Sequence, residues 1–345
     1  MRGLRYLALT LACAAGIGSG LAAAAEQAPA PSHTAATPSA ADSAPALISF
    51  QRDLISVLAP QANAMPLLAA ALLARPLPNQ PKYNDFHTLI DRAAQADDSG
   101  PEVSWVRLTD CDAKADACPN AGALAKLTQQ APDNAAVWLF KLGLDSHDNK
   151  SDDARKDLAQ AAAAKLYDDY TGTSLKALSS HISMLPPPAN TIPAALASGA
   201  SGVQVMIVFG TAETQPQPGL QATAQLCQDG AADAALKDDC LKLGKLLEWG
   251  SSPLARSLGL HLREVLATDP TQQEDAKRAR RNLIWQVQSF AELSSRAQGD
   301  KGLAQHLLAL ARNGGTEMSL LLAALRDYSM PTEAPADWQP AHAPN

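Results

Sequence analysis

The apolar residues of this chain recur at the three- and four-residue spacing of an α-helix. Two segments show the pattern over about three turns, with apolar side chains at Leu47, Phe50, Leu54 and Leu58 and at Leu236, Cys240, Leu243 and Leu247. Such spacing places the side chains on one face of a helix. The chain is also rich in Ala and Leu, and only 4% of its residues are aromatic. Helices are therefore favoured over strands, which prefer β-branched and aromatic residues.

One stretch, GVQVMIVFG at residues 202–210, has the composition of a strand. An isolated strand would have no partner in such a chain, so we interpret the stretch as a buried helix. The sequence predicts an all-α protein, built as an array of antiparallel helical hairpins or as an irregular helical bundle.

The first 25 residues have the pattern of a secretory signal peptide. Arg2 and Arg5 precede an apolar stretch that begins at Leu7, and small residues lead up to Ala25. The apolar stretch is too short to span a membrane. We expect cleavage before Glu26, no membrane-spanning segment afterwards, and export to the periplasm. Secretion and a lipid anchor on Cys13 are less favoured.

Removal of the leader leaves four cysteines, Cys111, Cys118, Cys227 and Cys240. An even number in an exported chain indicates disulfides. Three pairings exist, and the local pairs Cys111–Cys118 and Cys227–Cys240 need the least loop closure. A zinc site and a thioredoxin-like site are disfavoured, because neither pair has the C-x-x-C spacing. We expect the second pair to tie two antiparallel helices near their turn.

Composition divides the chain into five parts. We expect a signal peptide at residues 1–25, a flexible linker rich in Ala, Pro and Ser at 26–44, helical regions at 45–185 and 186–329, and a flexible Pro-rich tail at 330–345. One continuous helical array and two subdomains are both compatible with this division.

Residues 131–172 contain two predicted helices joined by a polar loop. The first helix carries Trp138 and Leu142, and the second carries Ala154, Leu158 and Ala161. This order of large and small residues resembles a tetratricopeptide or Sel1-like repeat. The segment departs from the family pattern at Gly143, which falls one position late. The resemblance implies a helical hairpin scaffold that binds proteins or peptides and has no catalytic residues of its own.

Motifs for common enzymes and cofactors are absent from the sequence. It has no H-E-x-x-H metal motif, G-x-S-x-G elbow, phosphate loop or dinucleotide fingerprint. We therefore expect no cofactor and no metal. The acidic stretches DSHDNKSDD at residues 145–153 and DCDAKADAC at 110–118 lack the glycine and glutamate of a calcium loop, so we interpret them as solvated. None of the seven histidines is in a metal-binding arrangement, although His87 and His181 lie near Asp or Ser residues.

The overall charge is acidic. Loss of Arg2 and Arg5 with the leader lowers the basic residues from 28 to 26 against 35 acidic ones, a net charge of −9. Nucleic acid is therefore excluded as an expected partner. Residues Thr271 and Glu274 indicate the start of a long helix, whose apolar face we assign to Ala276, Leu283, Val287 and Phe290.

One basic run interrupts this acidic background on the same helix. It consists of Lys277, Arg278, Arg280 and Arg281. We interpret the run as a partner contact, or as an exposed helix face balanced by Glu274 and Asp275.

Two functions are compatible with these observations. The first is an exported, non-catalytic helical protein that holds a protein or peptide partner, as an adaptor or an inhibitor. The alternative is an all-α hydrolase acting on envelope polymers. A pocket in which a histidine meets Asp or Glu side chains would favour the hydrolase.

Overall fold

The computed structural model describes residues 40–111, 118–193, 196–212 and 214–340. Within these ranges the secondary structure is helical and no β-strand is present, which confirms the all-α prediction. The α-helices of the first half are α1 Ala40–Leu58, α2 Ala64–Ala74, α3 Phe86–Gln95, α4 Pro101–Arg107, α5 Ala121–Gln130, α6 Ala135–His147, α7 Ser151–Ala163 and α8 Thr171–His181. Those of the second half are α9 Ala200–Ala212, α10 Leu220–Asp229, α11 Ala234–Leu247, α12 Pro253–Leu266, α13 Pro270–Arg296, α14 Lys301–Asn313 and α15 Glu317–Asp327. Short 3-10 helices are η1 Lys82–Asn84, η2 Ile182–Met184 and η3 Ala189–Thr191.

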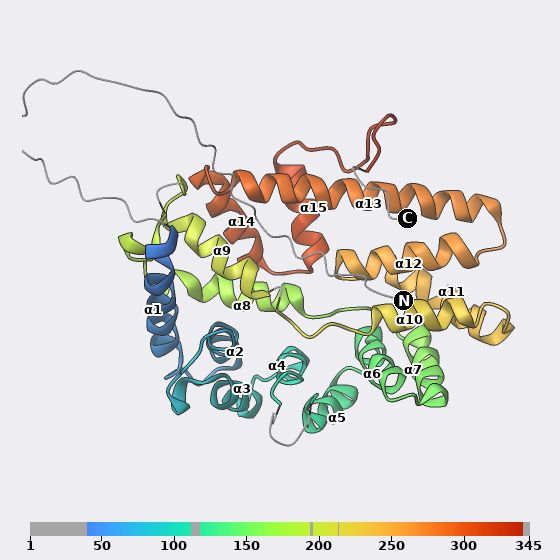
Figure 1. Cartoon of the computed structure of the whole chain (residues 1–345), viewed down its shortest axis with the longest axis horizontal. Helices are drawn as coiled ribbons and strands as arrows, with labels where there is room; N and C mark the ends of the chain where they lie inside the picture. The colour runs from blue at the N-terminus through green and yellow to red at the C-terminus, as the bar shows by residue number, and fades with distance from the viewer. Residues whose placement is uncertain (1–39, 112–117, 194–195, 213, 341–345) are drawn as a thin grey trace, which may run out of the picture. The chain divides into compact units, whose positions relative to one another are not determined.

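Helices that follow one another in the chain pack as antiparallel hairpins (Figure 1). The closest pairs are α2 with α3, α6 with α7, α11 with α12, and α12 with α13. The hairpin of α6 and α7 in turn packs on α10 and α11. The predicted array of antiparallel hairpins is therefore present in the described part of the chain.

Two large hydrophobic clusters form the core. The first joins α1, α2, α3, α8 and α9, and includes side chains from both sides of the Pro186–Pro188 stretch. The second joins α5, α6, α7, α10, α11 and α12 around Trp105. The predicted faces lie inside them, since Phe50, Leu54 and Leu58 are buried. The strand-like stretch at 202–210 belongs to helix α9, as predicted.

Both expected disulfides are present, Cys111–Cys118 and Cys227–Cys240. The second links α10 to α11, and both of its cysteines are fully buried in the second core. A disulfide that closes a loop of this length stabilises a fold by about 3 kcal/mol. The two hairpin helices are thus fixed to each other near their turn.

A buried set of polar residues joins the two halves of the chain; we call Asn134, Asp168, Asp169, Tyr170 and Ser251 the polar junction. Asn134 Nδ2 donates to the Asp168 carbonyl at 2.7 Å and to Tyr170 Oη at 3.2 Å. The Ser251 hydroxyl donates to Asp169 Oδ1 at 3.1 Å. Burial is the main cause that raises the pKa of Asp168, and it raises the pKa of Tyr170 to about 12.

The polar junction also reaches the last helices. The carbonyl of Ser251 accepts from the N–H of Met318, in the first turn of α15, at 2.9 Å. Gly172, at the start of α8, lies so close to the α14–α15 connection that an added Cβ would stand 2.0 Å from the Gly315 carbonyl oxygen. Side chains larger than hydrogen therefore do not fit at position 172 without movement of the backbone.

The two glycines Gly172 and Gly210 allow a matched test of this contact. We expect Gly172→Ala to lower the free energy of unfolding by about 1–3 kcal/mol, because the methyl group meets backbone atoms. Gly210 lies exposed in α9 with open space at its Cβ position. Gly210→Ala should therefore raise the free energy of unfolding by about 0.5–1 kcal/mol through helix propensity. Urea denaturation followed by circular dichroism measures both, and equal effects would contradict the close approach.

Candidate functional site

The basic run lies on α13, whose N-terminus differs from the prediction. Asp269 caps the helix by accepting from Thr271 N at 2.9 Å, and Pro270 is the first helical residue. An Asp followed by Pro is a strong start because proline suits the first helical position. The predicted helix start at Thr271 and Glu274 is therefore wrong, because the capping residue is Asp269 and the first helical residue is Pro270.

The inner face of α13 follows the predicted spacing in part. Ala276 and Leu283 are buried, and Phe290 packs against the core. Val287 is 37% exposed, so it does not belong to the inner face. The outer face is left free for contacts with other segments.

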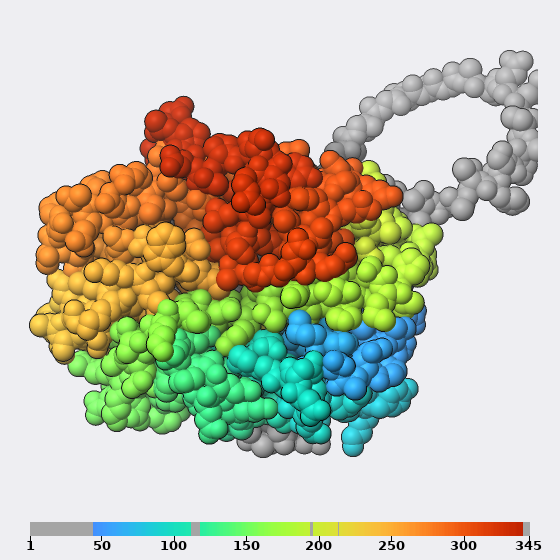
Figure 2. Space-filling model, turned by 180° about the vertical axis from the view of Figure 1, so that it is seen from behind, coloured from blue at the N-terminus to red at the C-terminus, as the bar shows by residue number. Residues whose placement is uncertain are grey.

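Residues 331–340 lie along this outer face (Figures 1 and 2). Ser329 takes a positive φ of 55°, which reverses the chain after α15. Met330 N then donates to the Leu325 carbonyl at 2.8 Å, and the Met330 side chain packs against the core. These residues belong to the predicted flexible tail at 330–345, and residues 331–340 contact α13 through the hydrogen bonds described below.

Two side chains of α13 bind the start of the segment through its main-chain carbonyls. Trp285 Nε1 donates to the Pro331 carbonyl at 2.8 Å. One turn away from the basic run, Gln286 Nε2 donates to the Thr332 carbonyl at 2.8 Å. Neither contact depends on the side chain of the bound residue, so this part of the face recognises main-chain carbonyls.

Arg281 and Trp285 bind the end of the segment. The Arg281 guanidinium donates to the Trp338 carbonyl, at 3.1 Å from Nε and 2.9 Å from Nη2, and also to the Pro335 carbonyl. Its central carbon lies 5.9 Å from the centre of the Trp338 ring. The Trp338 and Trp285 rings meet edge to face with centroids 5.4 Å apart. Such aromatic and cation–π contacts add specificity to the hydrogen bonds.

The bound segment, PTEAPADWQP, has three prolines in ten residues. Proline has no N–H but keeps its carbonyl acceptor, and two of the carbonyls bound by α13 are those of Pro331 and Pro335. The one main-chain N–H of the segment bound by α13 is that of Ala334, which donates to Asn282 Oδ1 at 3.1 Å. We call the four α13 residues that make these contacts the tail groove; they are Arg281, Asn282, Trp285 and Gln286.

A pocket of about 430 Å³ continues the tail groove toward the start of α13. Its lining consists of the four residues of the basic run together with Glu274, Ile284, Gln339 and Pro340. Three of the basic side chains have acidic neighbours, namely Lys277–Glu274 at 3.7 Å, Arg278–Asp275 at 2.7 Å and Arg280–Glu264 at 3.0 Å. Lys277 and Arg278 remain exposed and present positive charge to solvent. This basic pocket is therefore a local exception on an acidic protein.

The hairpin residues of α6 and α7 lie elsewhere and serve packing. Leu142, Ala154, Leu158 and Ala161 are buried in the second core. Trp138 is half-buried at its edge, where Nε1 donates to the Pro132 carbonyl at 2.8 Å. The structure does not bring these residues near the basic run.

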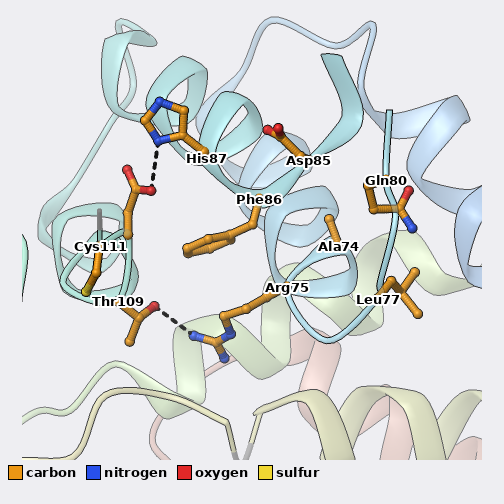
Figure 3. Close-up of a pocket in the computed structure, with 10 residues that line it drawn as sticks. Ala74, Arg75, Leu77, Gln80, Asp85, Phe86, His87, Thr109 and Cys111 are labelled. Atoms are coloured by element: carbon orange, nitrogen blue, oxygen red, sulfur yellow. Dashed lines mark hydrogen bonds and ion pairs between the residues drawn. The ribbon is translucent and has the colours of Figure 1, made fainter. Parts of the chain in front are cut away.

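A second pocket, of about 310 Å³, lies between the end of α2, the start of α3 and the chain after α4 (Figure 3). His87 Nδ1 is 2.9 Å from Asp110 Oδ1; the histidine side chain is 72% exposed and the carboxylate 6% exposed. The hydrogen bond with Asp110 is the main cause that raises the pKa of His87. An imidazole oriented in this way through Nδ1 leaves Nε2 free to act as a base.

Arg75 enters the same pocket from α2 (Figure 3). Its Nη1 donates to Thr109 Oγ1 at 3.3 Å, and its guanidinium carbon lies 5.7 Å from the centre of the Phe86 ring. Desolvation by burial lowers the pKa of Arg75 to about 10. In the described residues no serine or cysteine side chain hydrogen-bonds His87, and Cys111 in the lining is part of a disulfide. The pocket thus holds a base without a nucleophile beside it.

From the sequence, the basic run is interpreted as a partner contact or an exposed helix face, and His87 is noted only for the Asp residues near it; the tail groove is not predicted. The available signal was the presence of Trp285 and Trp338 in a chain with only five tryptophans. The stretch at residues 110–118 is interpreted as solvated, but Asp110 is buried and pairs with His87, and Asp112 and Asp116 lie outside the described residues.

No known protein family matches the chain, and neither a curated protein nor a solved structure matches it. Among the described residues, no group of three or more His, Cys, Asp or Glu side chains is placed to hold a metal ion. In the same part of the chain, none of the helices has the length and apolar character needed to cross a bilayer.

The pair of His87 and Asp110 predicts a pH dependence. In the folded protein the pKa of His87 should stand above its usual value of about 6.5, and Asp110→Asn should return it toward that value. A raised pKa means that the stabilisation is complete below the unfolded pKa and is lost as the pH rises through the folded pKa. NMR titration of the imidazole measures the shift. An unchanged pKa in the Asp110→Asn protein would contradict the pairing.

Proposed function

We propose that this protein is an exported, non-catalytic helical scaffold that binds a protein partner through the outer face of α13. The observation that carries the proposal is that α13 binds a non-helical segment of the same chain. Trp285 and Gln286 donate to carbonyl groups, which every protein segment offers. A face that binds main-chain carbonyls in this way is suited to peptide recognition.

The basic pocket beside the tail groove supplies the electrostatic part of the proposal. Lys277 and Arg278 are exposed, and their charges stand out on a chain with a formal net charge of −7. Exposed charges of this kind increase the rate of association with a partner of opposite charge and fix its orientation. An acidic partner surface therefore fits the α13 face best.

Other features of the chain support the scaffold and its export. The α6–α7 hairpin packs on α10 and α11, and helical hairpins that stack on one another can present a surface for a binding partner. Two disulfides suit an oxidising compartment such as the periplasm. They agree with the signal-peptide pattern of residues 1–25.

A hydrolase is the second candidate, and one observation favours it. His87 is oriented by the buried Asp110 in a pocket that also holds Arg75. Such a base can activate a water molecule. If this function is correct, the purified protein should release soluble products from envelope polymers and His87→Gln should abolish the release; an inert protein would end this candidate.

Charge reversal tests the scaffold. We expect Lys277→Glu with Arg278→Glu to weaken capture of the partner from envelope and culture fractions about tenfold, since two attractive contacts become repulsive. Lys242→Glu on α11 is the matched control, because Lys242 is equally exposed and pairs with Asp238 at 2.6 Å. Mass spectrometry and titration of the captured protein give the affinity. Equal capture by both variants would contradict the proposed contact.

A further inference from the structure

The segment at residues 331–340 makes contacts of a kind that a separate peptide could also make. Its hydrogen bonds with the tail groove connect side chains of α13 to main-chain groups of the segment. Most of the segment is exposed to solvent, and Trp338 is its one large half-buried side chain. When the segment leaves the groove, little buried apolar surface other than the ring of Trp338 therefore becomes exposed to water.

We infer that residues 331–338 are an intramolecular ligand of the tail groove, and that the groove's partner is a proline-containing segment with a tryptophan followed by an acidic residue. The inference rests on the proposed function and specifies the partner. The tryptophan is required because Trp285 and Arg281 both contact the Trp338 ring. Prolines restrict the backbone of such a segment and so lower the entropy lost on binding.

The position of Gln339 is the reason why we infer an acidic residue after the tryptophan of the partner. Gln339 lines the basic pocket together with Lys277 and Arg278. Gln339 is neutral, so the chain's own segment leaves the positive charge of the pocket without a charged partner from the segment. A ligand with a carboxylate at this place would gain an attraction that the intramolecular segment lacks.

The short connection makes the intramolecular segment a strong competitor. Met330 is anchored by its bond to Leu325 and directly precedes Pro331, so the segment is held beside the groove. Short tethers give effective concentrations in the millimolar range. A partner must therefore displace the segment, and its apparent affinity is lowered by the fraction of molecules in which the groove is occupied.

Peptide titration into the whole oxidised protein tests the inference. The probe is a labelled peptide with the sequence of residues 331–340, and a second probe has Glu in place of Gln339. We expect the Trp338→Ala protein to bind the first probe about tenfold or more tightly than the unchanged protein, since its own segment competes less. The second probe should bind more tightly than the first, and the gain should shrink at high salt.

Trp285→Ala in the Trp338→Ala protein is the specificity control and should abolish binding of both probes. Circular dichroism of each variant shows whether the helices are intact, and Val287→Ala, at an exposed position on the same helix, should leave binding unchanged. Failure of both probes to bind the well-folded Trp338→Ala protein would overturn the inference. The charge-reversal capture would then still decide the proposed function, because it uses the unchanged segment.

A second copy of the chain is the competing occupant. Light scattering over a range of protein concentrations distinguishes it. A monomer at all concentrations, together with peptide binding by Trp338→Ala, supports a separate partner. A dimer of the unchanged protein that Trp338→Ala dissociates would assign the groove to the segment of another copy and overturn the partner proposed here.

Discussion

The buried polar junction positions the rest of the described chain. Asn134 and Asp168 are 34 residues apart, and they meet because the Asn134 side chain satisfies both main-chain groups of Asp168: Nδ2 donates to its carbonyl and Oδ1 accepts from its N–H. Buried polar groups are costly unless they are paired, so this arrangement permits few alternatives. Through Ser251 the junction also fixes Met318 in α15. Met330 follows the end of α15, and its position places the bound segment on the face of α13.

The sequence predicted what depends on local pattern. Helical spacing identified the buried face of Leu236, Cys240 and Leu243, and loop closure identified the disulfide pairs, because both rest on residues close in the chain. The junction and the tail groove depend on distant partners, and no local pattern shows that Gln286 will donate to Thr332. The proline-rich composition of residues 331–340 indicates that this segment has no core of its own. It does not indicate whether side-chain donors elsewhere in the chain will bind the carbonyls of the segment. The sequence shows the charge of the basic run. It does not show that the run lies beside the bound segment.

The α13 face and the His87 pocket make different demands on a partner. At α13 the donors and rings contact a non-helical segment, and the positive charge lies beside it. At His87 the base is oriented, and the described side chains near it offer no hydroxyl or thiol in hydrogen-bond contact. Recognition is therefore supported by more contacts than catalysis. Occupation by the chain's own segment would keep the groove closed until a stronger ligand arrives.

Solvent exchange of the Trp285 indole proton is the most direct measurement of the central claim, that α13 holds this segment. Trp249 is an internal reference, because its side chain is 78% exposed. With tryptophan-selective labelling, NMR resolves the indole protons of a chain that has five tryptophans. If α13 holds the segment, the Trp285 indole proton should exchange slowly and show a cross-peak to the Trp338 ring. Exchange as fast as that of Trp249, with no cross-peak, would show that α13 does not hold the segment in solution.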